Sequence, residues 1–188
     1  DQLYLSALKN LLISLGKITP LKDLIFIPTG GVKGIKATSN IIASKADERP
    51  FVIVDGDIPG QKTKKELLAD FYAADKEKII DISEYTSITN GEIEDLFPSE
   101  RMARIVSKFL PRPEEAEDEF EDVVEEGKPL CNQIEEFAKS QGIPLERGWK
   151  VQLASVIKKE ILRGKGKVIK EEDKEFTKIE ELFKRILS

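Results

Sequence analysis

Two acids follow directly on a short apolar stretch in the first third of the chain. Residues 51–54 are apolar and mostly strand-forming, and Asp55, Gly56 and Asp57 come next. A run this apolar predicts a strand buried on both faces, as in a parallel sheet. Ligands bind at the carboxyl ends of such strands, and two carboxylates on a short loop suit a hard cation such as Mg²⁺. The alternative is that both acids are solvated turn residues.

Three further acids at the starts of expected helices are candidate metal ligands. Asp1 opens the first helix, and Glu94 and Asp95 open a short helix later in the chain. The structural alternative for Asp1 is a helix N-cap, where the helix dipole favours an acid. The alternative for Glu94 and Asp95 is an exposed acidic turn. Adjacent helical residues point about 100° apart, so we expect one of Glu94 and Asp95 to face inward.

Candidate phosphate-binding groups are glycines and lysines. Gly30 and Gly31 lie in a strand-to-helix turn, where backbone N–H groups can hold a phosphate, although the Gly-Lys-Ser/Thr ending of a P-loop is missing. Lys150 stands at a helix start, where an ammonium can stabilise negative charge in phosphoryl chemistry. Lys165 and Lys167 lie in a basic loop that can contact a nucleic-acid backbone. The alternatives are an ordinary strand-to-helix turn for Gly30 and Gly31, a surface lysine for Lys150, and a solvated turn for Lys165 and Lys167.

Composition narrows the chemistry. The chain has 188 residues, no histidine and one cysteine. The lack of histidine removes Ser-His-Asp and Cys-His catalysis and His-ligated metal sites, which leaves carboxylates, Lys, Ser/Thr or a hard metal. Cys131 alone cannot form an internal disulfide, and it fits a reducing compartment, so we expect a cytoplasmic protein.

Charge and hydropathy exclude some classes of partner. No run of about 18 apolar residues exists, so we expect no transmembrane helix and no membrane partner. The net charge of −5 argues against a domain that simply coats nucleic acid. It leaves open a nuclease whose clustered acids are offset by bound metal.

Helices and strands are expected to alternate through about residue 85, which is typical of a parallel α/β sheet. After that point the chain is expected to be mostly helical, with an acidic stretch that predicts a solvated helix or a mobile connector. We expect strands at 24–27, 51–54 and 78–82, helices at 3–15, 32–45, 63–74, 92–97, 99–110, 128–140, 148–163 and 172–187, and the acidic stretch at 114–126.

Taken in order, these features resemble the Toprim domain, the metal-dependent fold of topoisomerases, primases and several nucleases. Residues 1–5 resemble the helix opening after that family's Glu-Gly strand, 27–31 its glycine turn, and 54–57 its Asp-x-Asp motif. Residues 93–98 and 149–154, with a lysine at a helix start, are similar to the C-terminal Toprim region of OLD-family (overcoming lysogenization defect) ATP-dependent endonucleases.

The resemblance implies three parts: a Toprim core at 1–88, its continuation with the acidic connector at 89–126, and a helical C-terminal part at 127–188. One departure concerns the glutamate that ends the family's first strand, because this chain begins after that position. We therefore expect a fragment of a longer protein that lacks one ligand and the first strand of its sheet. Metal binding would then be weakened, or a partner segment would supply the strand.

The resemblance implies a DNA endonuclease that uses two Mg²⁺ or Mn²⁺ ions. Asp55 and Asp57 would hold one ion, with Asp55 also catalytic. Asp1 and one residue of the Glu94/Asp95 pair would help the absent glutamate to hold the other. Lys150 would stabilise the transition state.

The expected partners are DNA and an N-terminal ATPase domain of the same polypeptide, with a possible homo-oligomer formed through that domain. ATP hydrolysis would belong there, because no Walker A motif is present in this sequence. The alternatives are the Toprim domain of a primase or an RNA-maturation nuclease, or a non-catalytic domain for dimerisation or effector binding.

Overall fold

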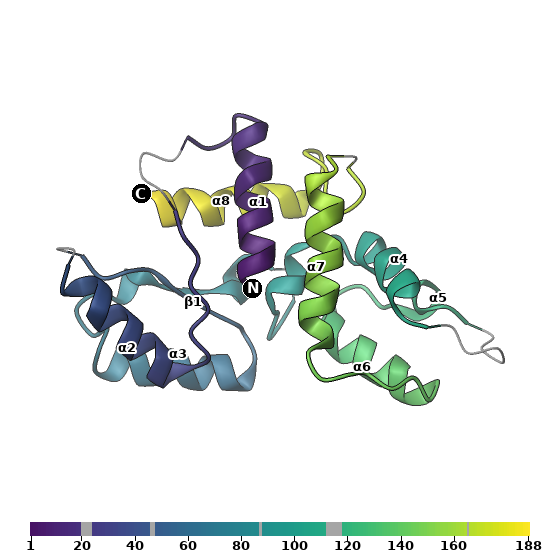
Figure 1. The fold of residues 1–188 in the computed structure, drawn as a ribbon, viewed down its shortest axis with the longest axis horizontal. Helices are drawn as coiled ribbons and strands as arrows, with labels where there is room; N and C mark the ends of the chain where they lie inside the picture. Colours follow the sequence, from purple (N-terminus) through teal and green to yellow (C-terminus); the bar gives the residue numbers. More distant parts are fainter. Residues whose placement is uncertain (20–23, 46–47, 87, 112–117, 165) are drawn as a thin grey trace.

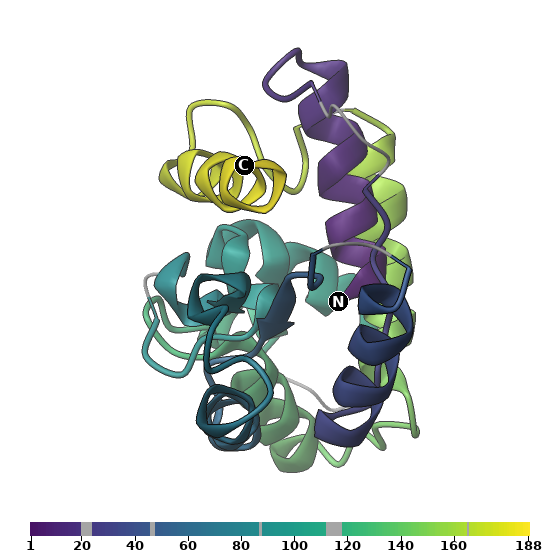
Figure 2. The ribbon, with the colours of Figure 1, turned by 90° about the vertical axis from the view of Figure 1, so that its left-hand side faces the viewer.

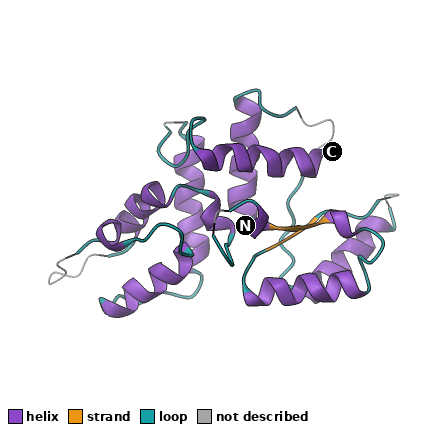
Figure 3. Cartoon of the chain, turned by 180° about the vertical axis from the view of Figure 1, so that it is seen from behind, coloured by secondary structure: helices purple, strands orange, loops and turns teal. Residues whose placement is uncertain are grey.

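The computed structural model describes residues 1–19, 24–45, 48–86, 88–111, 118–164 and 166–188. Helices surround a small parallel sheet, so the expected α/β class is confirmed at this level (Figure 3). The α-helices and strands are α1 Gln2–Ser14, α2 Val32–Ala43, β1 Val52–Val54, α3 Ile58–Ala69, β2 Ile79–Asp81, α4 Ser99–Phe109, α5 Phe120–Val123, α6 Leu130–Ser140, α7 Trp149–Leu162 and α8 Lys174–Leu187. Three 3-10 helices complete the order, η1 Lys76–Lys78, η2 Ile82–Glu84 and η3 Ile93–Leu96.

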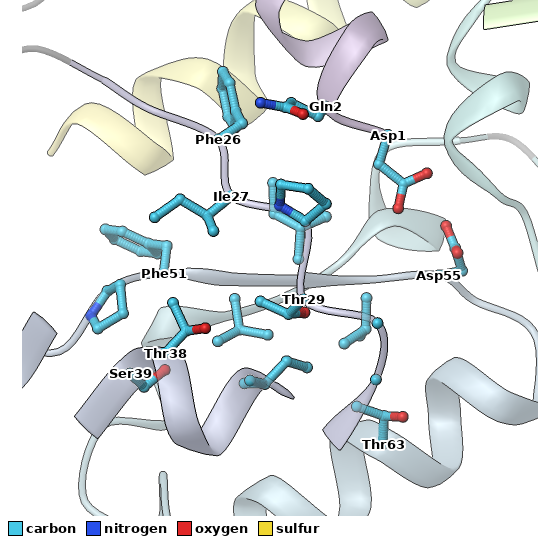
Figure 4. Close-up of a pocket in the computed structure, with 18 of the residues that line it drawn as sticks. Asp1, Gln2, Phe26, Ile27, Thr29, Thr38, Ser39, Phe51, Asp55 and Thr63 are labelled. Carbon is cyan, nitrogen blue, oxygen red and sulfur yellow. The ribbon is translucent and has the colours of Figure 1, made fainter. Parts of the chain in front are cut away.

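The sheet has two strands in the described part of the chain. Strands β1 and β2 run parallel, with Val52 opposite Ile79 and Val54 opposite Asp81. The expected strand at 24–27 is wrong. Figure 4 shows this segment crossing the direction of β1, whereas a ladder needs aligned strands about 4.8 Å apart. A cavity separates the segment from β1.

The two faces of the sheet join different apolar clusters. Side chains alternate across a strand, so Val52 and Val54 face one way and Ile53 the other. The first face packs with helices α2 and α3 in a small cluster. The second face joins the main core through Ile53 and Ile80. The buried members of the small cluster are Ile35, Val52, Val54, Leu67, Tyr72 and Ile79.

The main core links the start of the chain to its end. Helices α1 and α7 lie side by side, and α8 crosses near them (Figures 1 and 2). Buried Leu8 and Leu12 of α1 share this core with Ile157 of α7 and Phe183 of α8. Its members therefore come from each of the ranges 1–88, 89–126 and 127–188. Helix α7, which carries Lys150, is held against the helix that Asp1 opens.

Helix α3 begins earlier than expected. Asp57 caps it by accepting a hydrogen bond from the Gly60 N–H at 2.7 Å, and Pro59 occupies its first turn. The expected range 63–74 is therefore displaced. The 3-10 helix η3 is capped by Glu92.

The remaining expected helices are confirmed to within about two residues at each end. Part of the acidic stretch, 114–117, lies outside the described residues. The rest contains the short helix α5, whose Phe120 is buried with its ring centroid 5.5 Å from that of Phe137. None of the helices described has the length and apolar character needed to cross a bilayer.

Candidate functional site

Asp55 lies at the carboxyl end of β1, beside the start of α1. Figure 4 shows the carboxylates of Asp1 and Asp55 turned toward each other. Burial, together with the charges of Glu92 and Asp57, raises the pKa of Asp55 to about 6. Lys150 and the α-amino group of Asp1 act in the opposite direction. Asp55 is therefore a carboxylate with more negative than positive charge around it.

Asp81, a second acid at the same sheet edge, differs from Asp55 because its carboxylate is paired with hydrogen-bond donors. Asp81 ends β2, opposite Val54, and is 4% exposed. Its carboxylate accepts hydrogen bonds from Gln61 at 2.5 Å and Lys64 at 2.9 Å. Although burial opposes the effect, bonds from Ser83, Gln61 and Lys64 hold the pKa of Asp81 below its ordinary value. Asp81 is thus paired internally and has no need of a bound cation.

Gly56 joins the loop after β1 to the loop before η3. Its N–H donates to the Gly91 carbonyl at 2.9 Å. A Cβ at this position would lie 2.6 Å from Ser83 Cβ and 2.8 Å from the Gly91 oxygen. Glycine is therefore required by close approach of the backbone, and this approach brings Asp55 near the acids of η3.

Glu94 is the acid of η3 that joins the site. Its side chain is buried at 5% exposure. The pKa of Glu94 is raised to about 7, mainly by burial and also by the charge of Glu92. The charge of Lys150 acts in the opposite direction. Ligand atoms of Glu92, Glu94 and Cys131 lie within 4.8 Å of one another. Glu94 therefore shares a pocket of negative charge with Glu92, next to a buried thiol.

Asp95 has a different role from its neighbour. One carboxylate oxygen accepts from the Glu92 N–H at 2.8 Å, and the other accepts from the Leu130 N–H at 2.9 Å. Both oxygens are thus engaged in backbone hydrogen bonds that join η3 to the start of α6. Of the Glu94/Asp95 pair, the structure turns Glu94 toward the other acids and uses Asp95 as a structural anchor.

Lys150 provides the ammonium at this site. Its Nζ lies 2.7 Å from Glu92 Oε2, and 42% of the side chain is exposed. Although burial opposes the effect, the hydrogen bond to Glu92 and the charges of Cys131, Glu92 and Glu94 raise the pKa of Lys150. Lys150 is therefore charged and fixed at one end, yet accessible from solvent.

A cavity of about 460 Å³ lies beside β1 and brings together most of the expected loop residues. Its lining includes Asp1, Asp55 and Asp57, and also the turn of Gly30 and Gly31. The two glycines have φ of 64° and 102°, where side chains are disfavoured. The three acids disfavour a bare phosphate here, so the turn can receive one only together with a cation.

Lys167, one of the two loop lysines, does not join this site. Lys165 lies outside the described residues. Lys167 pairs with Glu160 at 3.1 Å, near the carboxyl end of α7. Lys150 lies ten residues before Glu160 on this helix, about 15 Å away at 1.5 Å per residue.

Three residues of the site were missed by the sequence reasoning. Glu92 stands two residues before Glu94, so the spacing Glu-x-Glu was an available signal. Cys131 was considered only for disulfides and the redox compartment, and Tyr4 only as part of the segment 1–5. Their approach to Glu94 comes from the packing of α1 and α6 on η3, which no local pattern encodes.

Comparisons of the chain with protein-family models, with curated proteins and with solved structures found no significant match.

Proposed function

We propose that this chain carries a divalent-cation-dependent phosphodiesterase site of the Toprim type that cleaves DNA. One observation carries the proposal. Asp55, at the end of a buried parallel strand, lies beside Asp1 and near the charges of Glu92, Asp57 and Lys150. Glu94 lies next to Glu92 and near the same Lys150 ammonium. The pKa values of Asp55 and Glu94 are both raised, as expected for carboxylates that lack sufficient positive charge.

The donor set fits a hard cation. Asp1, Asp55 and Asp57 line one cavity, and Glu92 and Glu94 lie next to each other at the start of η3. Carboxylate oxygens are the ligands that Mg²⁺ and Mn²⁺ prefer. Asp57 caps α3 through one oxygen, which leaves its other oxygen for a ligand. Such an ion, when bound, supplies an activated water and stabilises the leaving oxygen.

The remaining residues have roles that follow from their positions. Lys150 offers N–H donors at the solvent side and can stabilise charge on a phosphate oxygen. The N–H groups of Gly30 and Gly31 lie at the start of α2, where a helix favours an anion. Asp55 is the acid with a pKa near neutrality that faces the cavity, so it suits the acceptance of a proton from a nucleophilic water.

A second candidate, a non-catalytic interaction domain, is favoured by the unpaired edge of β1. In the described residues β1 pairs only with β2, and the cavity beside it is lined by apolar side chains such as Ile27 and Phe51. Free edges with apolar surroundings accept added strands. This candidate predicts peptide binding that does not depend on Asp55.

The test measures Mn²⁺ binding and nicking of supercoiled plasmid by the chain and its variants. Asp55→Asn keeps the shape of the side chain and removes its charge, so we expect Mn²⁺ affinity to fall at least about tenfold and nicking to be lost. Asp118→Asn, at an exposed position, is the matched control and should change neither. Full Mn²⁺-dependent nicking by Asp55→Asn would overturn the proposal.

A further inference from the structure

We propose that Glu92, Glu94 and Cys131 form a binding site for one thiophilic divalent cation, of the class of Zn²⁺ or Cd²⁺. This site differs in chemistry from the oxygen ligands around Asp55. It shares Glu94 with them, but its existence does not depend on nuclease activity.

The geometry is close to that of a three-ligand centre. Ligand atoms of Glu92, Glu94 and Cys131 all lie within 4.8 Å of one another. With bonds of about 2.3 Å to sulfur and about 2.1 Å to oxygen, tetrahedral ligands are about 3.5 Å apart. The three side chains therefore need only small rotations to reach one cation. Glu94 and Cys131 are buried, at 5% and 2% exposure, so the ligands are held inside the fold.

Tyr4 supplies an independent observation. Its side chain is fully buried, and its hydroxyl makes no hydrogen bond of good geometry with the described residues. Glu94 acts on this hydroxyl through its charge and as the acceptor of a weak side-chain hydrogen bond, and Cys131 and Glu92 also act on it, so the hydroxyl faces this cluster. A buried hydroxyl that is poorly paired is unfavourable. A cation with three protein ligands keeps a fourth position for water, and that water would pair with Tyr4.

Ligand softness selects the cation. Thiolates favour Zn²⁺ and similar ions over Mg²⁺, whereas the acids around Asp55 offer oxygen alone. Charge also balances, because two carboxylates and one thiolate would face a divalent cation and the Lys150 ammonium. The thiol proton leaves to solvent when the cation binds. The ion pair between Lys150 and Glu92 can persist, since a carboxylate has several acceptor positions.

Purely structural roles account for only part of this arrangement. Glu92 caps η3 and pairs with Lys150, and Cys131 packs as a small apolar residue of α6. Neither role explains why Glu94 is buried beside Glu92 and Cys131, or why the Tyr4 hydroxyl faces these same side chains. A bound cation with its water explains both.

The test titrates the reduced chain with Cd²⁺ and follows the ultraviolet charge-transfer absorption of a Cd²⁺–thiolate bond. We expect one thiolate-bound Cd²⁺ per chain, displaced by Zn²⁺ but not by a large excess of Mg²⁺. Cys131→Ala should remove the absorption and lower Cd²⁺ affinity at least about tenfold. Glu94→Gln, which changes charge and not shape, should lower the affinity by a similar factor. Glu136→Gln, at an exposed position of α6, is the matched control and should leave the absorption unchanged.

Two outcomes would overturn the proposal. One is the absence of charge-transfer absorption in the folded chain, with folding checked by circular dichroism. The other is unchanged Cd²⁺ affinity in Glu94→Gln, which keeps the thiol and tests the site even where Cys131→Ala fails to fold. Failure of the nuclease proposal would look different, because Asp55→Asn would then leave nicking intact whatever the Cd²⁺ titration gives.

Discussion

Asp95 accepts a hydrogen bond from the backbone N–H of Leu130 at 2.9 Å, across 35 positions of the sequence. The same carboxylate accepts from the Glu92 N–H at 2.8 Å. It therefore joins the start of α6 to η3, and it fixes Cys131 close to Glu92 and Glu94. The arrangement of the acidic site depends on this one buried side chain.

Asp95→Ala should therefore act on stability. Two buried N–H donors lose a charged acceptor, so we expect a loss of about 3 kcal/mol in the free energy of unfolding, measured with urea. Glu136→Ala, at an exposed position of α6, is the control and should change it by less than about 0.5 kcal/mol. A variant of normal stability with abolished Mn²⁺ binding would instead make Asp95 a ligand.

The raised pKa of Glu94 predicts a pH-dependent stability without cation. Its pKa is about 7 in the fold, against an ordinary value of 4.5. Between these values the folded state binds more protons than the unfolded state, so stability falls as pH rises from 4.5 to 7. The effect is on the order of 3 kcal/mol. Glu94→Gln should flatten the dependence of Tm on pH and be more stable than the wild type at pH 8.

The control for that measurement is Glu136→Gln, at an exposed position, which should follow the wild-type curve. A saturating divalent cation should also flatten the wild-type curve, because it binds the deprotonated acids. An unchanged slope in Glu94→Gln would contradict the assignment of the raised pKa to this residue.

Lys150→Met should separate cation binding from catalysis. Loss of the ammonium leaves Glu92 without its partner at 2.7 Å and makes the site more negative. We therefore expect Mn²⁺ to bind as tightly as before or several-fold more tightly, while plasmid nicking falls at least about 100-fold. Lys159→Met, on an exposed part of the same helix, is the control. Parallel losses of binding and nicking would assign Lys150 a role in the fold alone.

Gly56→Ala should disturb the link between β1 and η3. The added Cβ would overlap Ser83 Cβ and the Gly91 carbonyl, at 2.6 and 2.8 Å. We expect a loss of about 2–3 kcal/mol in unfolding free energy, together with weaker Mn²⁺ binding. Gly142→Ala, where φ is +65° and no atom is near, should cost about 1 kcal/mol and leave Mn²⁺ affinity unchanged. Normal stability of Gly56→Ala would show that the two loops can separate without cost.

Local patterns predicted the helices well. Apolar spacing along residues 3–15 and 148–163 gave α1 and α7, because both helices bury one continuous face. The start of α3 was misplaced, since Pro59 and Gly60 were not recognised as first-turn residues behind the Asp57 cap. The expected strand at 24–27 failed for a different reason. Strand propensity does not determine whether an apolar segment has a partner to pair with.

The sequence could predict the site residues that follow a strand end. It could not predict those whose position depends on packing between distant segments. Asp55 could be found because acids at the carboxyl end of a buried strand reach a sheet edge. The choice between Glu94 and Asp95 needed the position of Leu130, which is remote in sequence. Lys167 was a candidate for contacting a nucleic-acid backbone, but its pairing with Glu160 places it at the opposite end of α7 from Lys150.

The two apolar clusters on opposite faces of the sheet divide the molecule into two parts that differ in their stability against local unfolding. Six buried side chains hold α2 and α3 to the sheet, whereas the main core extends from α1 to α8. The smaller layer should therefore open by itself, with faster amide hydrogen exchange in α3 than in α7. Asp57 belongs to that layer as the cap of α3, and Glu94 belongs to the other. A cation bound to both would oppose this opening and slow amide exchange in α3.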